Sequence, residues 1–143
     1  MTTNTGFAHG DLTGRTIEGF LETYNELGSG FSEAVCRNAL SIVLTDNGLK
    51  VAIDVPIGVQ FRGRTIGQFF ADMVVNDTVL VEIKAGQQLE GYPQAQLLNY
   101  LRGAGGGVGL LLNFGRRPEY KRMVMGNPLD SLPLLRRSQI PQD

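Results

Sequence analysis

Residues 78–84, Thr-Val-Leu-Val-Glu-Ile-Lys, constrain the fold of this chain more than any other segment. Six of these seven residues suit a β-strand, in which successive side chains point to opposite faces. Glu82 and Lys84 then share a face with Leu80, on an otherwise apolar strand. Because an unpaired buried charge is costly, two interpretations stay open. The segment is either an edge strand with a solvated salt bridge or the centre of a metal site.

The periodicity of the rest of the chain predicts a single α/β domain. Helical spacing of apolar residues predicts three helices, over residues 11–27, 32–46 and 94–102. Alternating or continuous apolar runs predict five strands, over residues 51–61, 65–75, 78–84, 108–114 and 120–125. Short turns join the first three strands, which therefore form an antiparallel meander.

Two apolar stripes are expected to face the core. In the second helix the expected buried stripe is Phe31, Val35, Ala39, Ile42 and Val43. In the first strand one face is expected to hold Val51, Ile53, Val55, Ile57, Val59 and Phe61. Cys36 has an apolar helical setting without a nearby histidine, so it is interpreted as a buried structural thiol rather than a nucleophile.

The length of 143 residues fits one domain, expected over residues 11–125 between a disordered tail at 1–10 and a C-terminal tail at 126–143. With one cysteine, and the one histidine (His9) in the first tail, a zinc site built from such ligands is excluded. A lone cysteine suits a reducing compartment, and no segment resembles a signal peptide or membrane span. The expected location is therefore the cytoplasm, with no membrane partner.

Asp72 lies within an apolar strand, directly before the strand that carries Glu82 and Lys84. Two carboxylates on adjacent strands, with a lysine nearby, are what a hard divalent cation such as Mg²⁺ or Mn²⁺ and its activated water require. Gln96 and Tyr100 lie one turn apart on the following helix. They are either a solvated polar face or groups that contact a nucleic-acid backbone.

This metal site depends on the register between two strands. A two-residue hairpin at Asn76 and Asp77 would pair residues whose numbers sum to 153, which places Asp72 and Glu82 on opposite faces. A three-residue loop over 76–78, or a bulge, gives an even sum, and a sum of 154 sets Asp72 opposite Glu82. We therefore predict such a loop or bulge.

These motifs, in this order, resemble those of known nucleases. Asp72, Glu82 and Lys84 are similar to the motif of the PD-(D/E)xK superfamily, and Gln96 with Tyr100 is similar to the Q-x-x-x-Y extension of its RecB-like branch. More closely, the chain resembles the small bacterial GxxExxY proteins over about residues 11–125. The five segments that carry this likeness are residues 26–33, 71–75, 81–85, 96–101 and 109–115.

The resemblance implies a restriction-endonuclease-like fold, an αβββαβ core with a mixed sheet flanked by helices. It also implies Mg²⁺-dependent hydrolysis of nucleic acid, DNA rather than RNA, and it leaves homo-oligomerisation open. The implied metal ligands are Asp72, Glu82 and Glu33, the implied catalytic lysine is Lys84, and the implied supporting residues are Gln96 and Tyr100. Without the resemblance, the residues alone indicate a different role for Glu33. It is then a first-turn acid that complements the helix dipole and pairs with Arg37.

The chain departs from the GxxExxY pattern at Cys36, which replaces a tyrosine, and at Tyr24 and Phe70, which replace a histidine and an arginine. These departures favour the rival hypothesis, a catalytically inactive module of the same fold that binds nucleic acid or protein. The intact carboxylates and lysine favour the enzyme. The candidate phosphate contacts are Arg62, Arg64, Arg116, Arg117, Lys121 and Arg122. The alternative for each is an ordinary solvated side chain on the surface.

Overall fold

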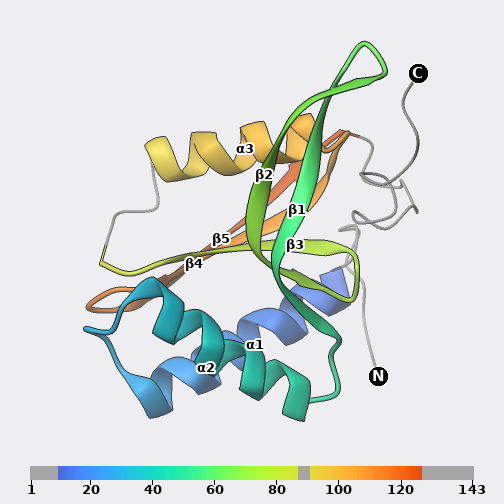
Figure 1. Ribbon diagram of the computed structural model, residues 1–143. Helices are drawn as coiled ribbons and strands as arrows, with labels where there is room; N and C mark the ends of the chain where they lie inside the picture. Colours follow the sequence, from blue (N-terminus) through green and yellow to red (C-terminus); the bar gives the residue numbers. More distant parts are fainter. Residues whose placement is uncertain (1–9, 87–90, 127–143) are drawn as a thin grey trace.

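The computed structural model describes residues 10–86 and 91–126, so most of both predicted tails lies outside the described residues. The eight elements follow the predicted order (Figure 1). The helices are α1 (Gly10–Leu27), α2 (Glu33–Asp46) and α3 (Tyr92–Gly103). The strands are β1 (Val51–Phe61), β2 (Arg64–Val75), β3 (Val79–Lys84), β4 (Gly107–Phe114) and β5 (Pro118–Met125). Among the described residues, no helix is long and apolar enough to cross a membrane.

The strands form one mixed sheet in the order β1-β2-β3-β4-β5. β1, β2 and β3 are antiparallel neighbours, as the meander predicts, and β5 is antiparallel to β4. β3 and β4 are parallel, because α3 returns the chain across the sheet between them. α1 and α2 cover one face and α3 covers the other (Figure 1). The predicted α/β architecture is confirmed.

Each face of the sheet has its own core. Under α1 and α2 lie Met73, Val75, Val79, Val81, Ile83, Val108, Leu110, Leu112 and Phe114. Under α3 lie Val55, Ile57, Ala71, Val74, Leu80, Leu111 and Met123. Successive residues of β3 and β4 alternate between these two cores, so both strands are buried on both faces. Glu82 is therefore held within the sheet instead of at its edge.

The predicted buried stripe of α2 is wrong. The helix buries Cys36, Leu40 and Leu44 against Phe20 of α1, whereas Phe31, Val35 and Ile42 are exposed. The helix carries two apolar stripes, and α1 and the sheet together cover only the one with i, i+4, i+8 spacing. The expectation of a buried Cys36 is confirmed.

Gly19 sets how closely α1 approaches α2, and alanine should show this. A Cβ at Gly19 would overlap the buried Leu44 side chain. Gly19→Ala should therefore lower the free energy of unfolding by about 1–3 kcal/mol through overpacking. Gly14, in the same helix, has no heavy atom within 4 Å of the position a Cβ would take. Gly14→Ala should therefore raise the free energy of unfolding by about 0.5–1 kcal/mol. Urea titration measures both, and equal effects would contradict the close contact.

β1 does not keep one apolar face along its length, so the predicted face of residues 51–61 is also wrong. Val51 packs under α1 and α2, whereas Ala52 and Val55 both pack under α3. The alternation breaks at Asp54, whose φ of 53° is left-handed. β2 changes face at the same level, between Ala71 and Met73. Beyond this point the two strands continue as a hairpin that projects past the rest of the sheet (Figure 1).

Candidate functional site

The register between β2 and β3 agrees with the prediction. Met73 pairs with Val81, and Val75 with Val79, so that paired numbers sum to 154. Residues 76–78 form the three-residue loop, in which Asn76 and Asp77 adopt left-handed φ values of 51° and 57°. Asparagine and aspartate tolerate this conformation better than most side chains. The sequence at the turn therefore sets the register that brings Asp72 opposite Glu82.

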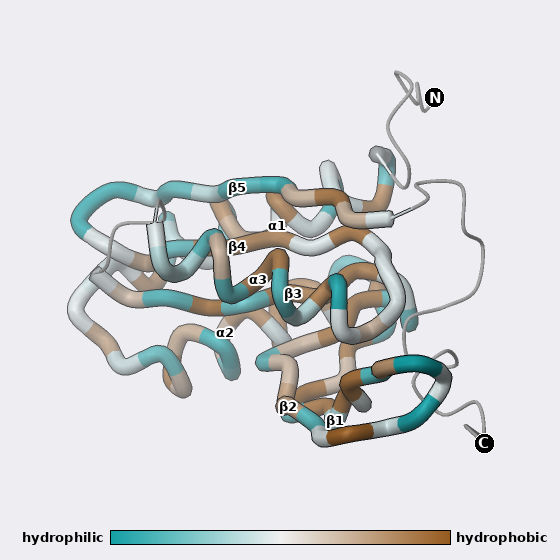
Figure 2. The backbone as a smooth tube through the Cα atoms, turned by 90° about the horizontal axis from the view of Figure 1, so that it is seen from above, coloured by the Kyte–Doolittle hydropathy of each residue, from teal (hydrophilic) through white to brown (hydrophobic). Residues whose placement is uncertain are grey.

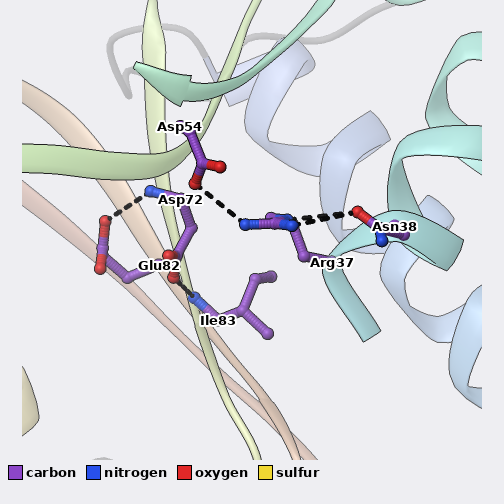
Figure 3. A network of polar contacts seen from close by, with 6 residues as sticks. All are labelled: Arg37, Asn38, Asp54, Asp72, Glu82 and Ile83. Atoms are coloured by element: carbon purple, nitrogen blue, oxygen red, sulfur yellow. Dashed lines mark hydrogen bonds and ion pairs between the residues drawn. The ribbon is translucent and has the colours of Figure 1, made fainter. Parts of the chain in front are cut away.

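The two carboxylates lie where the backbone ladder between β2 and β3 ends. The last backbone pair is Met73 with Val81, and Asp72 and Glu82 follow it. The backbone N–H of Asp72 donates to Glu82 Oε2 at 3.1 Å, and that of Ile83 donates to Asp72 Oδ2 at 2.7 Å (Figure 3). At this level the carboxylates accept the hydrogen bonds that backbone carbonyls accept elsewhere in the ladder.

Glu82 is 6% exposed, and its environment disfavours its charge. Burial, followed by the negative charge of Asp72, raises the pKa of Glu82 to about 8. The N–H of Asp72 and the ammonium of Lys84 oppose this rise in pKa, whereas the charge of Glu33 adds to it. Glu82 thus lies within electrostatic range of three other predicted site residues, and this group sets three carboxyl groups against one ammonium.

Glu33 reaches this group from the first turn of α2. Ser32 caps the helix, its hydroxyl accepting from Val35 N at 3.3 Å. Glu33 is exposed, and its charge also contributes, after burial, to the raised pKa of the Cys36 thiol. The suggested pairing of Glu33 with Arg37 is not seen, because Arg37 forms its ion pair with Asp54 at 2.9 Å (Figure 3).

α3 brings Tyr100 near Glu82 and Asp72 from the face of the sheet opposite to α2. Its ring stacks on Phe69 of β2, with centroids 3.9 Å apart. Burial raises the pKa of the Tyr100 hydroxyl, and the charges of Glu82, Tyr92 and Asp72 add to the rise. Gln96 is half-buried one turn earlier, and the structure gives it no hydrogen bond to a described residue. Tyr100 thus lies within electrostatic range of the two carboxylates, and Gln96 lies one turn before it on the same helix.

Comparison with known protein families decides the kinship of the chain. The family model of the PD-(D/E)XK nuclease superfamily matches residues 10–123. The chain belongs to this superfamily. A search of the curated proteins and a search of the solved structures each found no significant match. For a PD-(D/E)XK protein, the mixed sheet flanked by helices is consistent with a restriction-endonuclease-like fold, and membership suggests a nuclease acting on nucleic acid.

In this PD-(D/E)XK chain the candidate basic residues do not gather at the carboxylates. Arg62 and Arg64 lie at the turn between β1 and β2, and Arg116 and Arg117 at the turn between β4 and β5. These turns lie at opposite ends of the molecule in both views (Figures 1 and 2). On β5, Lys121 and its neighbour Arg122 point to opposite faces. The six residues therefore form no single patch.

The positions that depart from the GxxExxY pattern have structural roles or are exposed. The Tyr24 hydroxyl donates to the Gly115 carbonyl at 2.6 Å, which joins α1 to the turn after β4. Cys36 is fully buried in the core. Phe70 is exposed on the projecting hairpin, two residues before Asp72. Of the three, Phe70 is the closest in sequence to the site carboxylates.

Asp54 also reaches this region, although the sequence analysis did not single it out. From Val51 to Val59, paired residues of β1 and β2 sum to 126, which sets Asp54 at the level of Asp72. Its carboxylate holds Arg37, whose guanidinium also contacts Asn38 (Figure 3). In the sequence, Asp54 occupies an ordinary outward position of an alternating strand. Its left-handed φ alone marks it, and this is visible only in the structure.

The donor set suits a hard divalent cation. Asp72 and Glu82 offer carboxylate oxygens, and a bound cation would oppose the burial and the Asp72 charge that raise the pKa of Glu82. Within the described part of the chain, no group of three His, Cys, Asp or Glu side chains is arranged to hold a metal ion. A cation here would take two carboxylates and complete its shell with water, which is how Mg²⁺ commonly binds.

Proposed function

We propose that this chain is a Mg²⁺- or Mn²⁺-dependent nuclease of the GxxExxY group that hydrolyses phosphodiester bonds, in DNA rather than RNA. The observation that carries the proposal is the pair of interlocked carboxylates, Asp72 and Glu82, beside Lys84. Two adjacent acids in a low-dielectric setting repel each other, and a divalent cation relieves this repulsion.

The residues would divide the chemistry as follows. Asp72 and Glu82 would hold the metal directly, and the Glu33 carboxylate from α2 would contact the water in its shell. A bound divalent cation lowers the pKa of water and offsets the charge of the phosphodiester. The Lys84 ammonium would stabilise the negative charge that develops on the phosphate, while Tyr100 and Gln96 would position the substrate. Water adds to phosphorus and one P–O ester bond breaks, which leaves one phosphomonoester end and one hydroxyl end.

Cleavage assays on four substrates test this function. Single- and double-stranded DNA and RNA of matched sequence are incubated with Mg²⁺ or Mn²⁺. We expect cleavage of DNA that EDTA stops and that Asp72→Asn abolishes, with slower or no cleavage of RNA. Absence of cleavage on all four substrates with both metals would overturn the proposed activity.

Metal binding itself should depend on the charge of Asp72. Asp72→Asn keeps an oxygen that can accept from Ile83 N but removes a negative charge, so Mg²⁺ affinity should fall tenfold or more. Asp77→Asn is the matched control. Asp77 lies in the β2–β3 loop and its carboxylate pairs with Lys50, so this variant removes the same charge away from the proposed metal site. Isothermal titration calorimetry measures both variants. Equal affinity of wild type and Asp72→Asn would remove Asp72 from the metal site.

One observation favours the second candidate function, an inactive module of this fold that binds nucleic acid or protein. Both carboxylates already accept backbone hydrogen bonds that join β2 to β3, so they have a structural role without any metal. The same assays separate the two candidates. An inactive module would show neither metal-dependent cleavage nor a Mg²⁺ affinity that depends on Asp72.

A further inference from the structure

A cavity of about 290 Å³ lies at the end of the sheet where the parallel strands β3 and β4 finish. Three segments line it. The α1–α2 loop contributes Gly30 and Phe31, the chain after β3 contributes Ala85 and Gly86, and the β4–β5 turn contributes Arg116. Figure 1 shows these three segments at the same end of the molecule. Ligands of open α/β sheets commonly bind outside the carboxyl ends of the parallel strands, so this cavity is a candidate binding site.

The walls of the cavity suit a nucleotide. The side chain of Phe31 is 47% exposed, and the other walls are mostly glycine, alanine and the buried Phe114. Among the described residues that line the cavity, Arg116 is the only charged one. Arg116 is exposed and forms no hydrogen bond or ion pair with any described residue. An exposed ring and an available cation, without acids, match the base and the phosphate of an unstacked nucleotide.

The cavity is small, which limits its occupant. Its volume of about 290 Å³ lies at the lower end of the range of about 300–1,000 Å³ that is typical of small-molecule pockets. One base with its phosphate suits this size, whereas a duplex presents stacked and paired bases that would have to be extruded first. The volume therefore favours one nucleotide of an unpaired strand over a duplex.

The cavity borders the carboxylate site along two stretches of the chain. Ala85 directly follows Lys84, so their Cα atoms are about 3.8 Å apart. Phe31 lies two residues before Glu33, whose charge reaches Glu82. A nucleotide in the cavity would therefore be next to a phosphodiester group held at the carboxylates.

The path between the carboxylates and the cavity passes from one face of the sheet to the other. Lys84, two residues after Glu82 on β3, points to the α3 face, whereas Phe114 at the cavity belongs to the core under α1 and α2. β3 ends at Lys84, so no further residue of this strand separates the two faces. Glu82 already interacts with groups on both faces, with Glu33 on α2 and Tyr100 on α3. A bound strand can therefore pass the end of β3 and enter the cavity.

We propose that this cavity binds one unpaired nucleotide of the substrate strand, next to the phosphodiester group held at Asp72 and Glu82. The base lies against the Phe31 ring, and its phosphate contacts the Arg116 guanidinium. The inference rests on the proposed function for the class of its ligand, nucleic acid. It adds that the strand is unpaired at this nucleotide, so that the protein acts on single strands, ends or melted segments rather than on intact duplex.

Fluorescence anisotropy with labelled oligonucleotides in EDTA tests the cavity without cleavage. We expect the wild type to bind single-stranded DNA more tightly than duplex. Phe31→Ala should weaken single-strand binding roughly tenfold, because one stacked base is lost. Val35→Ala should leave binding unchanged, since Val35 is 42% exposed on α2 and does not line the cavity. An abasic deoxyribose-phosphate oligomer of the same length should bind wild type and Phe31→Ala equally, which separates a lost base contact from a lost fold.

The salt dependence of binding tests the phosphate contact. Arg116→Gln should lower the slope of log affinity against log salt by about 0.7, the value for one phosphate contact of a single strand. Arg102→Gln removes the same charge from the last turn of α3, where Arg102 donates to Asn99, and should leave the slope unchanged. Equal changes of slope in the two variants would overturn the contact of Arg116.

The outcomes separate this inference from the proposed activity. Base-dependent binding that Phe31→Ala weakens, without cleavage in Mg²⁺, supports the cavity and overturns the nuclease. Cleavage by a protein whose Phe31→Ala variant binds single strands as tightly as wild type supports the nuclease and overturns the cavity. Preference for duplex, or equal weakening by Val35→Ala, also overturns the proposal. Deoxyadenosine monophosphate that binds as tightly as the oligonucleotide would overturn it too, because the cavity would then hold a free nucleotide.

Discussion

Lys84→Ala should lower the rate of phosphodiester cleavage by about two orders of magnitude or more, while Mg²⁺ affinity stays within a few-fold of wild type. The ammonium lies close enough to Glu82 to lower its pKa, so it is also placed to stabilise charge that develops on a phosphate held at the two carboxylates. Removing it takes away a charge interaction that strengthens as the transition state forms. Single-turnover cleavage measures the rate, and calorimetry measures the metal affinity.

Lys50→Ala is the control for this prediction. Lys50 lies just before β1, where its ammonium pairs with Asp77 at 2.8 Å and is well exposed. Its removal changes the net charge of the protein by the same amount and should leave the cleavage rate unchanged. Cleavage by Lys84→Ala within twofold of the wild-type rate would show that Lys84 has no part in the chemistry.

Glu82→Gln should stabilise the protein at pH 8 by a few kcal/mol and leave its stability at pH 4.5 nearly unchanged. The folded protein keeps the Glu82 proton up to about pH 8, whereas the unfolded chain releases it near the ordinary value of 4.5. Between these values the unfolded state binds fewer protons, so wild-type stability falls as pH rises. Each unit of difference between the folded and unfolded pKa corresponds to about 1.4 kcal/mol of stability. Glutamine cannot ionise and avoids this loss of stability.

Thermal and urea unfolding at several pH values measure this effect. Glutamine can still accept from the N–H of Asp72, which separates the charge from the hydrogen bond. Mg²⁺ should raise the unfolding temperature of wild type at pH 8, because it compensates the same charge, and should have little effect on Glu82→Gln. A difference between wild type and variant that stays constant from pH 4.5 to 8 would contradict the raised pKa of Glu82.

Much of the fold could be predicted because its signals are local. The order of helices and strands follows from apolar spacing. The register between β2 and β3 follows from Asn76 and Asp77, since both tolerate the left-handed conformation that a three-residue loop needs here. Because that register sets Asp72 opposite Glu82, the close approach of these two residues was also accessible from the sequence.

The errors arose where tertiary contacts choose between local alternatives. α2 has two apolar stripes, and only its packing on Phe20 decides that Leu40, not Ile42, is buried. β1 alternates regularly in sequence, yet Asp54 takes a left-handed conformation that moves Val55 to the other face. The ion pair between Asp54 and Arg37 links residues 17 positions apart, so no local pattern indicates it.

The hydrogen bonds between β2 and β3 bear on how such chains would change in evolution. Beyond Met73, the two strands are joined through the carboxylates of Asp72 and Glu82. If the proposed hydrolysis were lost in a descendant, both residues would still be selected for folding. Lys84 forms no side-chain hydrogen bond or ion pair with the residues that the structure describes, so its retention would depend on chemistry alone. Among relatives of this protein, the residue aligned with Lys84 should therefore separate active chains from inactive ones better than either carboxylate.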